Sequence, residues 1–193
     1  MNTQNYACLK KNSYVHENYE LVPIRIEDAE LIRKWRNEQI KFLRQEKFIS
    51  NEEQSQYFEK VILPTFDQLE PNIILFSFLE NSILIGYGGL VNINWNKKIS
   101  EISFLVETNR SKKSFTYETD FSIFLNLLKK ITCNELKFNK LFTETYDIRP
   151  NHINILEKNE FKISKKGNDQ KIINGNSVEI LFHSYICKMN ENI

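Results

Sequence analysis

The sequence predicts an α/β fold of the α+β type, with a central, mixed but mostly antiparallel sheet of about seven strands and about four flanking helices. Runs rich in β-branched and aromatic residues alternate with runs of helical apolar spacing, in the order β, α, α, β, β, β, α, β, α, β, β. Short turns between successive strands favour antiparallel pairing. At 193 residues, 41% apolar and 12% aromatic, the chain can form one domain with a substantial core.

The N-terminal part predicts an extension, a strand and a helix. Residues 1–18 are polar and without sustained period, so we expect a tail or loosely attached extension before a domain of residues 19–193. Residues 19–25 predict the first strand, and Pro23 favours an edge position because proline cannot donate to a strand ladder. Apolar residues at helical spacing predict the first helix over Glu27–Glu38.

A second helix and a hairpin follow. Ser50 precedes Glu53 by three residues, which is the spacing of a capping box, and we expect the helix to end at Pro64. Residues 72–79 and 83–93 are β-rich runs separated by three turn residues, so they predict a β-hairpin.

Three glycines lie inside the second strand of this hairpin, namely Gly86, Gly88 and Gly89. Glycine weakens a strand, so its presence indicates a bulge or a close approach by a ligand or another backbone. The run is not placed between a strand and a helix, as a dinucleotide-binding fingerprint requires.

Residues 101–131 are the most informative stretch for function. They predict a buried strand, which begins at Ile99 and ends at Val106, then a short basic loop and an amphipathic helix. Arg110, Lys112 and Lys113 lie in the loop, just before a helix N-terminus whose free N–H groups and dipole attract anions. This order predicts a site for a phosphate or pyrophosphate.

The C-terminal part predicts one further strand, a helix and a closing hairpin. Residues 140–148 are β-rich, and Pro150 favours the start of a helix that runs to about Lys158. Residues 161–164 and 178–186 predict two strands, separated by a polar segment that contains Gly167 and Gly175.

The composition argues against several functional classes. The net charge of +1 does not support binding to nucleic acid or to a membrane surface. No run is apolar enough to cross a bilayer or to serve as a signal peptide, so we expect a cytoplasmic protein. Cys8, Cys133 and Cys187 are odd in number and show no zinc-ligand spacing, so we expect reduced thiols without a disulfide framework.

Three segments carry a resemblance to a known family: IRKWRNEQ (Ile32–Gln39), EISFLVETNRSKKSF (Glu101–Phe115) and RPNHINILEKNEF (Arg149–Phe161). With the element order, they resemble the GNAT family of acetyl-CoA-dependent N-acetyltransferases. The resemblance implies a sheet whose fourth and fifth strands splay apart, acetyl-CoA as co-substrate, and no metal. It also implies a small-molecule amine acceptor and permits a homodimer.

Two branches of the family share the Trp-Arg-Asn of the first helix. One comprises the ribosomal-protein N-terminal acetyltransferases, and the other modifies amino groups on nucleotide-linked deoxy sugars. We favour an amino sugar on a nucleotide carrier as the acceptor. The alternatives are N-terminal acetylation of a protein and a non-catalytic module that binds acyl-CoA.

The resemblance also implies residues that bind the cofactor. Backbone groups of the central strand would hold the thioester and pantetheine, and the basic loop and the late helix would hold the rest: Phe104, Leu105, Val106, Arg110, Ser111, Lys112, Lys113, Ser114, Phe115, Asn151 and Asn154. The loop lacks the glycines that the family usually has, so lysine charge would replace part of the backbone contact. Leu156 stands where many relatives have a tyrosine that protonates the leaving thiolate.

Glu101 and His152 are the candidate catalytic residues. Glu101 could deprotonate the acceptor ammonium directly or through a water molecule, but it could equally be a solvent-facing strand residue. His152 could carry a proton, although a histidine in the first turn of an exposed helix is more often a surface residue. We assign no catalytic role to His183 or His16.

Six residues are candidates for binding the acceptor: Arg36, Asn37, Arg44, Gln45, Tyr87 and Trp95. Arginine and aromatic side chains suit the phosphate and base of a nucleotide. The competing interpretations are a plain surface arginine for Arg44 and a packing aromatic for Tyr87. Trp35, next to Arg36, falls on the apolar stripe of the helix and is assigned to the core.

Overall fold

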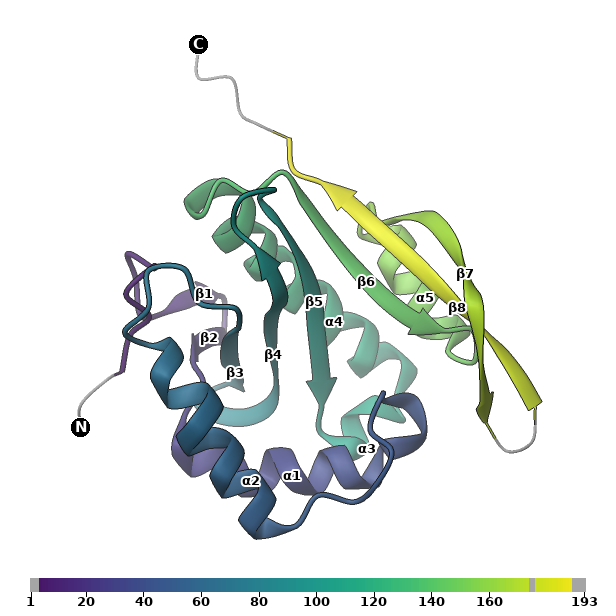
Figure 1. Cartoon of the computed structure of the whole chain (residues 1–193), viewed down its shortest axis with the longest axis horizontal. Helices are drawn as coiled ribbons and strands as arrows, with labels where there is room; N and C mark the ends of the chain where they lie inside the picture. The colour runs from purple at the N-terminus through teal and green to yellow at the C-terminus, as the bar shows by residue number, and fades with distance from the viewer. Residues whose placement is uncertain (1–3, 174–175, 189–193) are drawn as a thin grey trace.

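The computed structural model describes residues 4–173 and 176–188, which form one eight-stranded sheet flanked by helices (Figure 1). The strands are β1 (Tyr14–His16), β2 (Tyr19–Pro23), β3 (Ile74–Glu80), β4 (Ile83–Asn94), β5 (Ile99–Val106), β6 (Lys140–Tyr146), β7 (Lys162–Ile173) and β8 (Asn176–Ile186). The helices are α1 (Ala29–Glu38), α2 (Asn51–Tyr57), α3 (Thr108–Ser111), α4 (Ser114–Lys129) and α5 (Pro150–Lys158). The predicted element order is confirmed, with β1 and α3 as additions.

The sheet has the strand order β1-β2-β3-β4-β5-β6-β8-β7. Neighbouring strands are antiparallel except β5 and β6, which are parallel, so the predicted mixed sheet is confirmed. Strand β1 covers β2 as far as Leu21, so β2 is not the edge that the sequence indicated. Pro23 lies beyond the end of β1 and therefore still has no ladder partner on that side.

The segment before β1 is held against the core rather than loosely attached. The hydroxyl of Tyr6 is buried; it donates to the carbonyl of Leu75 and accepts from the amide of the same residue, each at 2.9 Å. Its ring stacks on Phe66 with the centroids 4.5 Å apart. Tyr6 therefore anchors the extension to β3, and the buried Leu9 adds to its packing on the core.

Helix α2 begins with the predicted capping box. The Ser50 hydroxyl accepts from the amide of Glu53, and the Glu53 carboxylate accepts from the amide of Ser50. The helix ends earlier than predicted, at Tyr57, and continues as a π-helical turn to Ile62 and a 3-10 turn that contains Pro64.

The glycines of β4 let the neighbouring strands approach closely. A Cβ atom on Gly86 would lie 2.7 Å from the carbonyl oxygen of Leu105, and one on Gly88 would overlap the backbone of Ser103. The close approach that the sequence predicts is therefore an approach of the neighbouring strand's backbone to β4. On one face of the sheet, Phe124 of α4 packs against Gly88. Its ring also makes an edge contact with Phe78, with the ring centroids 5.6 Å apart.

The closing hairpin is longer than the sequence indicated. Strand β7 continues past residue 164 to Ile173, with register shifts between Ile163 and Lys165 and between Lys166 and Gln170. Strand β7 is the last strand of the sheet. A strand at the edge of a sheet can contain many polar residues, because one of its sides faces water. Gly175, predicted in the turn, lies outside the described residues.

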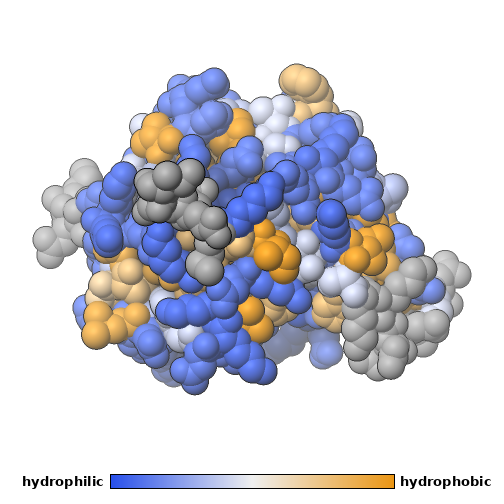
Figure 2. Space-filling view, turned by 90° about the horizontal axis from the view of Figure 1, so that it is seen from above, coloured by the Kyte–Doolittle hydropathy of each residue, from blue (hydrophilic) through white to orange (hydrophobic). Residues whose placement is uncertain are grey.

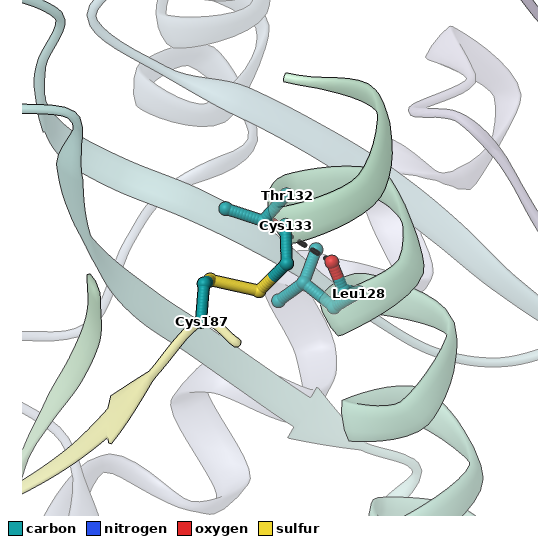
Figure 3. The surroundings of a disulfide bond; sticks show 4 residues. All are labelled: Leu128, Thr132, Cys133 and Cys187. Carbon is teal, nitrogen blue, oxygen red and sulfur yellow. Dashed lines mark hydrogen bonds between the residues drawn. A yellow bond between two sulfur atoms is a disulfide. The ribbon is translucent and has the colours of Figure 1, made fainter. Parts of the chain in front are cut away.

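Cys133 and Cys187 form a disulfide, which corrects the prediction of reduced thiols (Figure 3). The two residues are 54 positions apart in sequence, but the turn after α4 and the end of β8 bring their Cα atoms to 5.4 Å. The reduced state was inferred from cysteine count and local spacing, which carry no information on this long-range contact. A disulfide is unusual in a reducing compartment, so the predicted cytoplasmic location stays a prediction.

The face shown in Figure 2 is mostly hydrophilic, with apolar side chains in separate small groups. Within residues 4–173 and 176–188, no helix is long and apolar enough to cross a membrane. The same residues contain no group of three side chains suited to hold a metal ion.

We predict that reduction of the Cys133–Cys187 bond lowers the free energy of unfolding by about 2–4 kcal/mol, because the cross-link restricts the unfolded chain. The melting temperature should fall by roughly 10 °C when measured by calorimetry with and without reductant. The variant Cys187→Ser should melt at the lower temperature under both conditions.

The matched control is Cys8→Ser, because Cys8 is free and burial raises the pKa of its thiol to about 11. The melting temperature of Cys8→Ser should fall on reduction as much as that of the wild-type protein. An identical melting temperature for the oxidised and reduced wild-type protein would contradict a stabilising bond.

Candidate functional site

Strands β5 and β6 pair over only three positions and then separate. The paired residues are Ile99 with Lys140, Ser100 with Leu141 and Glu101 with Phe142. Figure 1 shows the two strands diverging from there toward the end of the sheet at which α3 lies. The structure therefore confirms the splay, and the edge of β5 that faces β6 has no strand partner beyond Glu101 among the described residues.

A cavity lies in this opening. It is lined by residues of the segment after α1, of both strands and of the two helices behind them: Phe42, Leu43, Arg44, Glu101, Ile102, Ser103, Phe104, Phe121, Thr143, Glu144, Thr145, Tyr146, Arg149, His152 and Leu156. Both candidate catalytic residues, Glu101 and His152, are among them. We call this space the splay cavity.

Glu101 is buried, with only 3% of its surface exposed, so it is not a solvent-facing strand residue. One carboxylate oxygen accepts from Asn92 Nδ2 at 2.7 Å, and the other accepts from Arg44 Nη2. Arg44 also donates to Glu144 of β6 at 3.1 Å. The guanidinium therefore bridges the two strands where they begin to separate, and it holds the Glu101 carboxylate at the cavity wall.

His152 is buried as well, although the sequence placed it on an exposed helix. Its ring stacks on Phe121 with the centroids 4.5 Å apart, and its Nδ1 atom lies 2.7 Å from the hydroxyl of Tyr117. The same hydroxyl accepts from Arg149 Nη2 at 2.7 Å. Burial, the Arg149 charge and His183 hold the pKa of His152 well below its usual range, so the imidazole is neutral near pH 7.

Tyr117 and Arg149 belong to this site, but sequence reasoning did not select them. Tyr117 falls on the apolar stripe of α4, and its side chain is buried. Burial raises the pKa of its phenol, while the nearby Arg149 lowers it. A tyrosine on an apolar helical stripe gives no signal that its hydroxyl meets two polar partners.

A second cavity lies between β4, β5 and the first two helices. Its lining includes Ile24, Ile32, Arg36, Arg44, Lys47, Ile49, Glu53, Gln54, Tyr57, Phe58, Leu75, Tyr87, Val91 and Ser103. Arg44 and Ser103 line both cavities, so the two spaces meet at the start of the splay. We call this second space the acceptor cavity, because Arg36, Arg44 and Tyr87, which the sequence predicts to bind the acceptor, line it.

Arg36 and Tyr87 lie together in the acceptor cavity, as the substrate prediction requires. Arg36 Nη1 donates to the hydroxyl of Tyr87 at 2.8 Å, and Arg36 Nε donates to Gln45 Oε1 at 3.0 Å. Both partners are neutral. By contrast, Lys47 pairs with Glu53 at 2.6 Å and Arg44 pairs with two carboxylates.

Two further predicted substrate residues have other contacts. Asn37 accepts from the amide of Ile49 and from Gln45 Nε2, and donates to the carbonyl of Ile49, so it fastens the segment after α1 to the helix. Trp95 is not brought to the site. Its indole donates to the carbonyl of Pro71 at 2.7 Å and packs edge-on against Phe138, so it stabilises the turn between β4 and β5.

The basic loop after β5 contains the short helix α3 and then leads into α4. The cap residue of α4, Lys113, makes no side-chain hydrogen bond to the helix, so the first amides of α4 are free for a ligand. The side chains at this end are exposed: Lys112, Lys113, Ser114 and Phe115. This exposure suits the predicted pyrophosphate site, which stays a prediction.

Arg110 differs from the lysines because its guanidinium is already paired. It donates twice to Asp120, at 2.7 Å for each nitrogen, and once to Glu80 at 2.9 Å. These carboxylates raise the pKa of Arg110. We therefore expect its side chain to hold the loop against α4, while Lys112 and Lys113 supply the charge for phosphate.

The remaining predicted cofactor residues are placed as follows. Phe104 lines the splay cavity and stacks on Phe121 at 4.6 Å, whereas Leu105 and Val106 have buried side chains. Ser111 donates from its hydroxyl to the carbonyl of Thr108. Asn151 and Asn154 lie on α5, partly buried and exposed respectively.

The chain matches known proteins in its sequence pattern and in its fold. A family model described as an acetyltransferase (GNAT) domain matches residues 21–180. No curated protein sequence matches the chain at a significant level.

Several solved structures share the fold. A dodecameric spermidine N-acetyltransferase from Vibrio cholerae has a TM-score of 0.75 at 17% identity, with 92% of this chain and 98% of that chain covered. The same enzyme in complex with CoA and spermine has a TM-score of 0.75 at 16% identity, covering 89% and 97%. A ribosomal-protein-S5-alanine acetyltransferase from Vibrio fischeri has a TM-score of 0.70 at 14% identity, covering 93% and 98%.

We predict that replacing Lys112 and Lys113 together by alanine weakens the binding of acetyl-CoA about tenfold, because two cations near the free amides of α4 are lost. Isothermal calorimetry at low and moderate salt would measure this change, and the salt dependence should decrease in the variant. The matched control is Lys10→Ala with Lys11→Ala, an exposed pair in the N-terminal extension. Unchanged affinity in the loop variant would mean that the backbone amides bind the cofactor without lysine.

Proposed function

Because this chain belongs to the GNAT family of acetyl-CoA-dependent N-acetyltransferases, we propose that its acceptor is a primary amine on a molecule that also carries an anionic group. An amino sugar on a nucleotide carrier has this combination. The observation that carries the proposal is Arg36, a cation of the acceptor cavity whose guanidinium donates hydrogen bonds to a phenol and an amide. Its remaining guanidinium nitrogen is the group that would meet a phosphate.

The charges of the acceptor cavity argue against a polyamine. The Vibrio cholerae relatives are spermidine N-acetyltransferases, and a polycation of that kind needs carboxylates along its length. Here Glu53, the carboxylate that lines the acceptor cavity, pairs with Lys47. Glu101 and Glu144 of the adjoining splay cavity share Arg44, so these three carboxylates already have a cation. Arg36 would repel a second ammonium group.

The aromatic side chains add a neutral surface to this cavity. Tyr57, Phe58 and Tyr87 line it together with Arg36. Rings of this kind stack on a base or on the apolar face of a sugar. The acceptor amine would then point toward the start of the splay, where Ser103 and Arg44 border both cavities.

Glu101 is the proposed base. Acetyl transfer to nitrogen requires a neutral amine, and the buried Glu101 carboxylate lies where the two cavities meet. Arg44 and Asn92 hold its two oxygens, so it would take the ammonium proton directly or through a water molecule. The nucleophilic nitrogen then attacks the thioester carbonyl, and the C–S bond breaks.

A homo-oligomer is also part of the proposal, because the Vibrio cholerae enzyme is described as dodecameric. A homodimer is the smallest such assembly. Light scattering of the purified protein would measure its mass, and a monomer would contradict this part of the proposal.

We predict that Glu101→Gln lowers kcat by about 100-fold, because the amide cannot accept the ammonium proton. The KM for acetyl-CoA should remain unchanged. The loss of kcat in Glu101→Gln should become smaller as the pH rises toward the pKa of the acceptor amine, since more of the amine is then already neutral. Glu59→Gln, an exposed residue near α2, is the matched control, and an equal loss of kcat at every pH would count against a role as base.

We predict that Arg36→Met raises the KM for a nucleotide-linked amino sugar by about ten- to a hundredfold, the effect of losing one charge-assisted hydrogen bond. The KM for the same amino sugar without its nucleotide should not change. The matched control is Arg33→Met, one turn earlier on α1, where the guanidinium pairs with Glu30. A thiol-release assay would measure the rates.

The same assay on wild-type protein separates the competing functions. The panel contains the nucleotide-linked amino sugar, spermidine and a peptide with a free N-terminal alanine. Preference for spermidine or for the peptide would overturn the proposed acceptor. Binding of acetyl-CoA without turnover on any amine would favour the non-catalytic module.

A further inference from the structure

Arg149, Tyr117 and His152 form a row of polar side chains within an otherwise apolar region. Tyr117 comes from the first turn of α4, and Arg149 and His152 come from the start of α5. Both hydrogen bonds of the row are 2.7 Å long. Tyr117 and His152 are buried, and Phe104 and Phe121 lie beside them at ring contact distance.

The chemistry of the guanidinium fixes the direction of the hydrogen bond between Arg149 and Tyr117, and the tautomer of His152 sets the direction of the other. A guanidinium can only donate, so the Tyr117 oxygen accepts from Arg149. The Tyr117 oxygen keeps its own proton, and we assign this proton to the hydrogen bond with His152, in which Nδ1 is then the acceptor. A neutral imidazole with an accepting Nδ1 atom carries its own proton on Nε2.

The Nε2–H group is the donor that this row leaves for a ligand. In the described part of the chain, the hydrogen bond shown for the His152 ring is made by Nδ1, and His152 lines the splay cavity beside Phe104 and Leu156. Leu156 lies one helical turn after His152 on the same face of α5 and offers only carbon atoms there. On this face of α5, the side chain that can donate a proton to a ligand is therefore His152.

We propose that Arg149, Tyr117 and His152 together protonate the thiolate that leaves acetyl-CoA, with His152 as the catalytic residue and the other two as positioning residues. This inference rests on the proposed acetyl transfer. When the C–S bond breaks, the sulfur takes the proton of His152 Nε2, and Nδ1 takes the phenol proton of Tyr117. The resulting phenolate is held by the Arg149 guanidinium until Nε2 takes a proton from solvent and the Nδ1 proton returns to the Tyr117 oxygen, which restores the starting state.

The variant Tyr117→Phe tests the row, because it keeps the buried ring and removes only the hydroxyl. With acetyl-CoA we expect kcat to fall by about 100-fold, while calorimetry gives an unchanged affinity for the cofactor. The matched control is Tyr185→Phe, the same change in a partly buried tyrosine of β8 that packs on Phe161 away from the cavity. Its kcat should equal that of the wild type.

A change of leaving group separates proton donation from a packing role. The selenoester analogue of acetyl-CoA has nearly the same shape, but its selenolate leaves without a proton because a selenol is a stronger acid than a thiol. Tyr117→Phe should therefore lose little kcat with the selenoester. An equal loss with both donors, or no loss with either, would overturn the proposal.

The tautomer of His152 gives a measurement that does not depend on turnover. In 15N NMR spectra of the wild-type protein near pH 7, we expect a neutral His152 ring with its proton on Nε2. A ring protonated on Nδ1 would overturn the proposed direction of the row. Failure of the wild type to acetylate any amine would instead overturn the proposed function, and the tautomer would still report on the row.

Discussion

The separation of β5 from β6 after Glu101 is the constraint on which the rest of the site depends. Paired strands would close the space between them with backbone hydrogen bonds and leave no room for a ligand. Here the two strands share only three paired positions. Arg44 joins their carboxylates at the point of separation, while Phe104 and Phe121 fill the space behind β5. Both cavities border this point.

The pairing of charges determines which cations are available to a ligand. The net charge of +1 has little meaning for the site, because charges act over short distances in salt solution. Arg110 and Arg44 are each bound to two carboxylates, so their charge is compensated. Lys112 and Lys113 are exposed, and Arg36 has neutral partners. Among the described residues, cations without a carboxylate partner therefore lie at both ends of the site, and Arg149, which donates to the Tyr117 hydroxyl, lies in the splay cavity.

Much of the fold could be predicted because its signals are local. The capping box at Ser50, the limits of β5 and the helix that begins at Pro150 follow from spacing and residue type within a few positions. The family resemblance rested on short segments of the same kind. The site was predicted in part for the same reason, since Glu101 lies on a strand whose place in the sheet could be inferred.

The sequence by itself determined the order of the elements, the mixed sheet and the acyltransferase family, because periodicity and motifs are written along the chain. Only the tertiary structure decided which polar groups meet. In it, Cys133 pairs with Cys187 across 54 positions, Trp95 packs at the turn between β4 and β5, and the Tyr117 hydroxyl contacts His152. Such contacts depend on how helices and strands pack, and a one-dimensional pattern does not record the direction in which a buried side chain points.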